Sequence, residues 1–172
     1  MNVRTMAQTP AGNTAGEGRV LVAYFSATGT TKSVAEKMAR AVGGDLYAIT
    51  PEKPYTSADL NWHNDRSRSS LEMNDPAARP AIAGKPLNVK DYDVVFIGYP
   101  IWWGVAPRVV NTFIESVNLE GKTVIPFATS GGSGIGSSVS ALRSAYPRIN
   151  WQSGRLLNSE HDMREWLSAM GY

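Results

Sequence analysis

The chain of 172 residues contains no cysteine. Disulfides, thiolate metal ligands and a cysteine nucleophile are therefore excluded, whereas the redox compartment stays open. Histidine is scarce as well, since the chain has two, His63 and His161. They lie far apart in the sequence and lack the spacing of metal ligands, so no metal site is expected.

The sequence also lacks a dense run of lysine and arginine. Its formal net charge is +2 at pH 7, which gives no indication of nucleic-acid binding. No apolar run approaches the ~20 residues that a membrane helix needs, so no membrane span is expected. With 42% hydrophobic and 19% charged residues, the composition is that of an ordinary globular protein of one domain.

Periodicity is absent from residues 1–17, which are polar, small and rich in glycine, threonine and alanine. This composition predicts a disordered leader or a remnant of a linker or of cloning, and places the folded domain at residues 18–172. The leader has no apolar signal-peptide core, so we expect a cytoplasmic protein. A removed signal sequence further upstream stays an alternative.

Short apolar runs alternate with amphipathic helical patterns along the rest of the chain. The runs predict strands at residues 20–25, 45–50, 93–99, 122–128 and 151–157. The helical patterns cover residues 30–42, 107–117, 135–146 and 159–170. This alternation predicts an α/β fold of three layers, in which a doubly wound, parallel, five-stranded sheet has the strand order 2-1-3-4-5.

Residues 51–90 form the least regular region, where five prolines interrupt any long element and a short helix is expected near residues 64–73. A loop of this length is often a lid or a binding loop. The alternative is that the segment only packs as a meandering crossover. The candidates for covering a ligand are Tyr55, Leu60, Trp62, Asn64, Arg66 and Arg68.

Hydroxyl side chains gather directly after the first predicted strand, where Ser26, Thr28, Thr30 and Thr31 surround Gly29. Glycine allows a tight turn, so that hydroxyls and backbone N–H groups, including that of Ala27, converge on one anion at a helix N-terminus. A simple helix cap is the alternative. Four hydroxyls exceed what one cap can use, so the pattern favours a phosphate site.

The arrangement Ser26-x-Thr28-Gly29-x-Thr31 after a hydrophobic strand resembles the FMN phosphate loop of flavodoxins, which that family writes as Thr/Ser-x-Thr-Gly-x-Thr. The segment GYPIWWGVAPRVVNTFIE, which begins at Gly98, resembles a flavodoxin branch that carries a YPxWWGxxP segment. The resemblance covers about residues 18–172. It implies the flavodoxin-like fold and FMN as a noncovalent cofactor.

Two further loops should meet the phosphate loop, because ligands of open α/β sheets bind at the carboxyl ends of the strands where the strand order reverses. The loop after the third strand contains Pro100, Ile101, Trp102, Trp103 and Gly104. Its indoles suit a flat ring, although a Trp-Trp pair alone more often packs a core or an interface. The loop after the fourth strand contains Thr129, Ser130, Gly131, Gly132, Ser133 and Gly134, whose N–H groups can reach ring carbonyls.

The resemblance implies electron transfer through the bound flavin to a redox partner protein or a small-molecule acceptor. No acid–base pair stands out, so the flavin would be the reactive group and no catalytic side chain is expected. The near-neutral charge differs from that of strongly acidic electron carriers. A second alternative is therefore that the chain is an FMN-dependent NAD(P)H:quinone-type oxidoreductase. The third alternative is a flavodoxin-shaped binding module without cofactor. The oligomeric state is not indicated.

Overall fold

The computed structural model describes residues 19–130 and 132–172. The predicted leader and the predicted site residue Gly131 lie outside the described residues. The strands are β1 (Arg19–Tyr24), β2 (Asp45–Ala48), β3 (Tyr92–Pro100), β4 (Thr123–Thr129), β5 (Asn150–Trp151) and β6 (Arg155–Leu156). The helices are α1 (Thr30–Val42), α2 (Arg68–Met73), α3 (Arg108–Ser116), α4 (Gly136–Ala145) and α5 (Glu160–Ala169).

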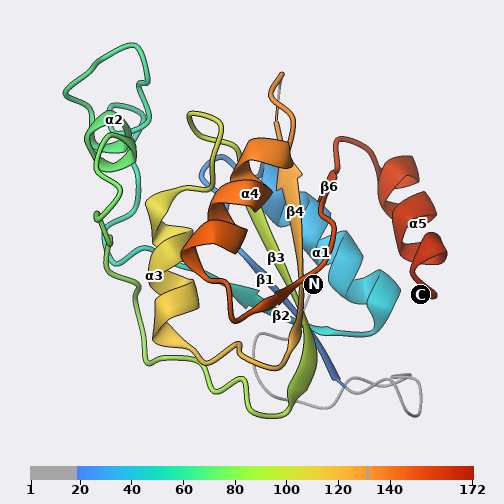
Figure 1. Cartoon of the computed structure of the whole chain (residues 1–172). Coiled ribbons are helices and arrows are strands. Elements are labelled where there is room, and N and C mark those ends of the chain that lie inside the picture. Colours follow the sequence, from blue (N-terminus) through green and yellow to red (C-terminus); the bar gives the residue numbers. More distant parts are fainter. Residues whose placement is uncertain (1–18, 131) are drawn as a thin grey trace.

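The strands form one sheet in the order β2-β1-β3-β4-β5, and every pairing between them is parallel. Helices cover both faces of this sheet (Figure 1). The predicted fold class and strand order are therefore confirmed. Strand β1 lies between β2 and β3, so the strand order reverses at this position, as the doubly wound topology requires.

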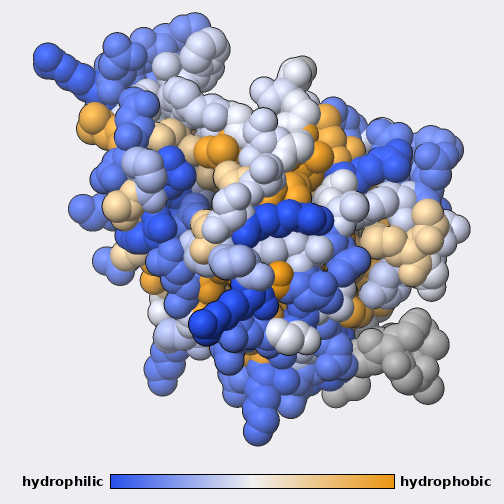
Figure 2. All heavy atoms as spheres, viewed as in Figure 1, coloured by the Kyte–Doolittle hydropathy of each residue, from blue (hydrophilic) through white to orange (hydrophobic). Residues whose placement is uncertain are grey.

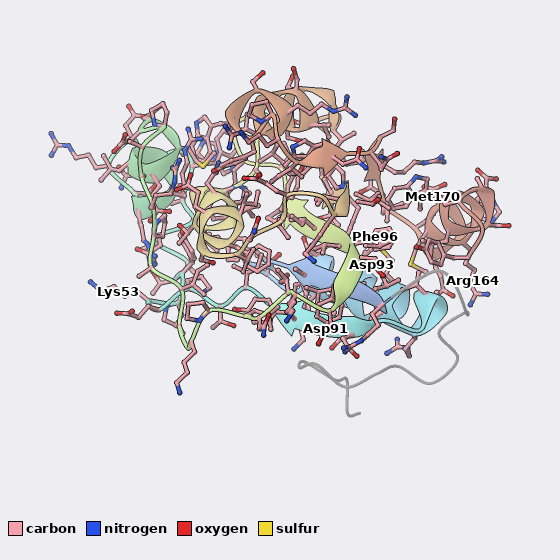
Figure 3. All side chains as sticks on the ribbon, turned by 60° about the horizontal axis from the view of Figure 1, so that its bottom comes forward. Lys53, Asp91, Asp93, Phe96, Arg164 and Met170 are labelled. Carbon is pink, nitrogen blue, oxygen red and sulfur yellow. The ribbon has the colours of Figure 1, made fainter. Side chains whose placement is uncertain are left out.

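Two hydrophobic cores lie on opposite faces of the sheet because successive residues of a strand point to opposite sides. Leu21 and Ala23 of β1 belong to the core that is covered by α3 and α4, and Val20 and Val22 belong to the core that is covered by α1 and α5. Phe96 of β3 belongs to the second core and contacts Trp166 of α5 edge-to-face at 6.0 Å. Figure 3 shows Phe96 between β3 and α5. Both faces of the central strands are buried.

The last predicted strand, at residues 151–157, is divided into β5 and β6, so the sheet has six strands rather than five. Proline in β4 explains the division. The carbonyls of Val124 and Ala128 accept hydrogen bonds from Gln152 and Leu157, both at 2.8 Å. Pro126 lies midway between Val124 and Ala128 and faces the same edge, but it has no N–H to donate.

Helix α2 is also shorter than expected, because it begins only at Arg68. Ser67 caps this helix and accepts a hydrogen bond from the backbone N–H of Ser70. Among residues 19–130 and 132–172, no helix combines the length and the apolar character that are needed to cross a membrane. The face in Figure 2 is mostly hydrophilic, with hydrophobic atoms in its upper part near α4 and β6.

Candidate functional site

The three loops that follow β1, β3 and β4 meet at one cavity of about 490 Å³ at the carboxyl edge of the sheet. This volume lies in the range of about 300–1,000 Å³ that small-molecule sites occupy. We call this cavity, which lies where the strand order reverses, the switch-point cavity. Its lining residues are Ala27, Thr28, Thr30, Thr31, Leu60, Pro100, Ile101, Trp102, Thr129, Ser130 and Asn158.

One end of the switch-point cavity is the N-terminus of α1. Gly29 occupies the cap position with a φ of 98°, and no side chain caps the helix. The side chain of Ser26 accepts from the N–H of Gly29 at 3.0 Å, so it shapes the loop instead of capping α1. The N–H groups of the first turn of α1 and the positive end of its dipole are therefore free to meet an anion.

Thr31 connects the loop after β1 to the end of β4. Its Oγ1 lies 2.8 Å from Oγ1 of Thr129, and both residues are buried. Two hydroxyls that share one hydrogen bond retain one further proton to donate. The hydroxyls of Thr28 and Thr30 make no hydrogen bond with another described residue, and both residues are exposed.

The aromatic loop after β3 closes in a tight turn. Trp102 and Val105 exchange two backbone hydrogen bonds of 2.9 and 3.0 Å. Between them, Trp103 and Gly104 have positive φ values of 50° and 79°, which is the pattern of a type I′ turn. A large side chain rarely adopts such a φ, and backbone strain of this kind gathers at ligand sites.

The two indoles of this loop have different surroundings. Trp102 lines the switch-point cavity and packs edge-to-face against Phe25 and Tyr55 at ring distances of 5.7 and 5.4 Å. Trp103 is 47% exposed and does not line the cavity. The aromatic wall is therefore made by Trp102, and Trp103 lies at the surface of the turn.

The irregular segment after β2 supports this wall through Tyr55. The Tyr55 hydroxyl donates to Glu72 at 2.5 Å, and the guanidinium of Arg68 lies over the Tyr55 ring at 3.9 Å. Arg68 also binds Glu72 at 2.9 Å. Burial, followed by the hydrogen bond to Glu72, raises the pKa of Tyr55 far above its usual value, so the hydroxyl stays protonated.

The lid candidates thus have different positions. Leu60 lines the switch-point cavity, and Tyr55 and Arg68 support its aromatic wall. Trp62 is 65% exposed and stacks on the neighbouring His63. Asn64 and Arg66 are exposed.

The predicted cofactor-binding residues are also distributed over different places. Ala27, Thr28, Thr30, Thr31, residues 100–102, Thr129 and Ser130 line the switch-point cavity. Ser26 and Gly29 line a neighbouring cavity that shares Ala27 with it. Trp103 and Gly104 form the turn, whereas Gly132, Ser133 and Gly134 are exposed and do not line the cavity.

Asn158 lines the cavity and was not anticipated from the sequence. Its side-chain oxygen accepts from the N–H of Ser130 at 3.4 Å, which connects the loop after β6 to the loop after β4. A signal was present, because Asn158 is a polar residue that lies two positions after β6, a strand beside β4. Within the described ranges, no group of three or more histidine, cysteine, aspartate and glutamate side chains could hold a metal ion.

Solved structures share this architecture. A candidate flavoprotein from Bacteroides eggerthii DSM 20697 is 62% identical over 90% of this chain and 99% of that chain, with a TM-score of 0.86. A flavoprotein from Lactobacillus acidophilus NCFM, solved in complex with FMN, has a TM-score of 0.68 over 85% of this chain and 97% of that chain. The two sequences are 23% identical, so this likeness shows a common fold.

A curated relative, the FMN-dependent NADH:quinone oxidoreductase 4 of Bacillus cereus, is 28% identical over 131 residues, which is 74% of this chain. The matched region spans 61% of the length of that relative. The sequence profile of the family described as Flavodoxin matches residues 19–170, which is nearly the whole described part of the chain. The chain therefore belongs to the flavodoxin family.

Proposed function

We propose that this chain binds FMN noncovalently and transfers electrons through it. The observation that carries the proposal is the switch-point cavity, in which the loops after β1, β3 and β4 meet. Its two ends have different chemistry: hydroxyls and the uncapped N-terminus of α1 on one side, and Pro100, Ile101 and Trp102 on the other. A phosphate and a flat apolar ring within one ligand match these two ends.

The residues present fit this cofactor. Thr28, Thr30 and the first N–H groups of α1 hold the phosphate, and the bond between Thr31 and Thr129 fixes the loop in place. Trp102 covers the ring and excludes water from one side. FMN itself supplies the redox chemistry when bound.

No ionisable side chain is among the described residues that line the cavity. The role of the protein is therefore binding, orientation and exclusion of water. Membership in the flavodoxin family and the FMN complex of the fold neighbour from Lactobacillus acidophilus support this assignment. The other participant is a redox partner protein or a small-molecule acceptor.

The phosphate assignment is tested by titrating FMN and riboflavin, which lacks the phosphate, into the wild-type chain and into Thr28→Ala/Thr30→Ala. Hydrogen bonds to charged groups contribute about 1.5–3 kcal/mol each, so the double variant should bind FMN at least about tenfold more weakly. Riboflavin should bind both chains with similar affinity. Ser133→Ala, which changes an exposed residue outside the cavity, is the matched control.

Unchanged FMN affinity in the double variant would contradict the phosphate assignment. A colourless chain that takes up no FMN from solution would favour the cofactor-free binding module instead. An absorption spectrum with added FMN separates these two results.

A second candidate function is an FMN-dependent NAD(P)H:quinone oxidoreductase, which the name of the Bacillus cereus relative favours. Potentiometric titration of the FMN-loaded chain should show two well-separated one-electron steps if the chain is a carrier. Sustained turnover with NADH and benzoquinone, together with a single two-electron step, would favour the enzyme.

A further inference from the structure

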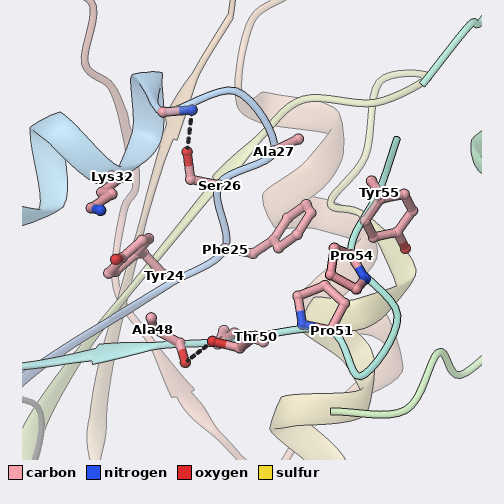
Figure 4. A pocket seen from close by; sticks show the side chains of 12 residues that line it. Tyr24, Phe25, Ser26, Ala27, Lys32, Ala48, Thr50, Pro51, Pro54 and Tyr55 are labelled. Carbon is pink, nitrogen blue, oxygen red and sulfur yellow. Dashed lines mark hydrogen bonds between the residues drawn. The ribbon is translucent and has the colours of Figure 1, made fainter. Parts of the chain in front are cut away.

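A second cavity, of about 280 Å³, lies behind the phosphate loop, between the end of β1 and the segment that follows β2 (Figure 4). We call it the rear cavity. It shares Ala27 with the switch-point cavity, but Trp102 and the loop after β4 do not line it. Its lining residues are Tyr24, Phe25, Ser26, Ala27, Gly29, Lys32, Ala48, Ile49, Thr50, Pro51, Pro54 and Tyr55.

Tyr24 brings a hydroxyl without a partner to the wall of the rear cavity. The residue is 6% exposed, and its hydroxyl forms no hydrogen bond with residues 19–130 and 132–172. The hydroxyl is not among the buried side-chain atoms that lack a partner, so it is accessible and can donate a hydrogen bond to a ligand in the cavity. Burial, and secondly the charge of Glu36, raise the pKa of Tyr24, so the hydroxyl is a donor at neutral pH.

Two more hydrogen-bond donors, Lys32 and Ser26, line the rear cavity on the same side as Tyr24. Lys32, in the first turn of α1, forms no ion pair with another described residue and lies beside Tyr24 in Figure 4. The Ser26 oxygen already accepts from the N–H of Gly29, so its own proton remains available for an acceptor. An ammonium and two hydroxyls make this side suitable for an oxyanion.

The opposite side of the rear cavity is apolar. Pro51, Pro54 and Tyr55 lie across from Lys32 and Tyr24 in Figure 4. Proline and tyrosine rings present flat apolar faces on which another ring can pack. The hydroxyl of Thr50 is directed to the carbonyl of Ala48 at 3.2 Å, so it does not supply a further free donor on this side.

We propose that the rear cavity binds a small aromatic carboxylate, with its anionic group at Tyr24, Lys32 and Ser26 and its ring against Pro51 and Pro54. A monoanion fits better than a phosphate ester for two reasons. Glu36, one turn after Lys32 on α1, repels a second negative charge. The FMN phosphate, which rests on the proposed function, adds a charge of about −1.5 to −2 on the other side of the same loop.

Benzoate is the probe for this site. It is titrated into the FMN-loaded full chain and followed by amide chemical shifts. Saturation at one site is expected, with the largest shifts at residues 24–32 and 50–55. Benzamide, which has nearly the same shape without the charge, should bind at least about tenfold more weakly, because charge-assisted hydrogen bonds are about twice as strong as neutral ones.

Variants locate the anion. Lys32→Met should weaken benzoate binding at least about tenfold and Tyr24→Phe about threefold or more, since each removes one donor to a charged group. Glu36→Gln should strengthen binding about twofold by removing a like charge. Lys37→Met is the matched control on the same helix, because Lys37 pairs with Glu160 at 3.5 Å and does not line the cavity.

Three results would overturn the proposal: no saturation by benzoate at tens of millimolar, wild-type affinity in both Lys32→Met and Tyr24→Phe, or displacement of benzoate by FMN. Circular dichroism shows whether each variant is folded. If the chain takes up no FMN, the same titration of the FMN-free chain still tests the rear cavity. Failure of the proposed function and failure of this site are therefore distinguishable.

Discussion

Gly98 leaves room for the ring of Phe127 between two central strands. It lies opposite Phe127 in the register of β3 and β4, and a Cβ at this position would lie 2.2 Å from the Phe127 ring. Gly98→Ala should therefore lower the free energy of unfolding by about 1–3 kcal/mol, the usual cost of overpacking a core. Urea unfolding measures this change.

Gly132→Ala is the control for that prediction, because a Cβ at Gly132 meets no atom within 4 Å. It should leave the urea midpoint nearly unchanged. Equal effects of the two substitutions would show that the Phe127 ring is not confined by Gly98.

The burial of Tyr99, near the end of β3, predicts that the free energy of unfolding falls at alkaline pH. The residue is fully buried, and its hydroxyl lies 2.9 Å from that of Ser138 at the start of α4. Burial raises the pKa of Tyr99 to about 12, against the opposing effect of Ser138. An unfolded tyrosine loses its proton near a pH of about 10.

Between these two pKa values the unfolded chain releases the Tyr99 proton while the folded chain retains it, so unfolding becomes easier as the pH rises. This contribution to stability is complete below pH ~10 and falls by about 1.4 kcal/mol per pH unit up to pH ~12. The stability difference between the wild type and Tyr99→Phe should therefore shrink across this window. A constant difference in urea titrations from pH 9 to 12 would contradict the burial argument.

At the scale of elements, Tyr55 connects the irregular segment to the aromatic wall. Tyr55→Phe keeps the ring on Phe25 and Trp102 and removes the hydrogen bond to the carboxylate of Glu72, which should cost about 1.5–3 kcal/mol. Local opening of residues 55–73 should then become at least about tenfold more frequent. Amide hydrogen exchange measures this opening.

Tyr55→Ala also removes the ring contacts, so exchange in residues 55–73 should become faster still, while β3 is little affected. Trp62→Phe is the control in the same segment, since Trp62 is 65% exposed. Unchanged exchange in Tyr55→Ala would show that other contacts hold the segment.

Most elements followed from local patterns in the sequence. The periodicity of residues 30–42 gave the bounds of α1, since Thr30 and Val42 are its ends. The division of the last strand into β5 and β6 could not be predicted from such a pattern, because it depends on Pro126 in a different strand. An apolar run at residues 151–157 carries no information about which carbonyls and N–H groups its neighbour offers.

At the scale of the whole molecule, cofactor binding should appear as stability. A ligand that binds only the folded chain stabilises it by about 2.7 kcal/mol at one hundred times its dissociation constant. FMN should therefore raise the free energy of unfolding by this amount, and riboflavin at the same concentration should raise it less. Equal stabilisation by FMN and riboflavin in thermal unfolding would indicate that the phosphate is not recognised.

The meeting of the three loops at one cavity was predictable, because the strand order decides which loops become neighbours. The roles of single residues within those loops were less predictable. Ser26 and Gly29 face the rear cavity although they belong to the motif, and Asn158 lines the switch-point cavity from outside the three loops. These positions depend on how distant segments pack against each other, which short-range patterns do not encode.

The division between β5 and β6 also bears on how the chain behaves among its own copies. Edge strands with long rows of unpaired backbone groups are templates for aggregation. Along the described part of the sheet, β5 and β6 have two residues each, and β2 at the opposite edge has four. Pro126 thus keeps the edge formed by β5 and β6 short and uneven, which makes this edge a poor template for a neighbouring strand.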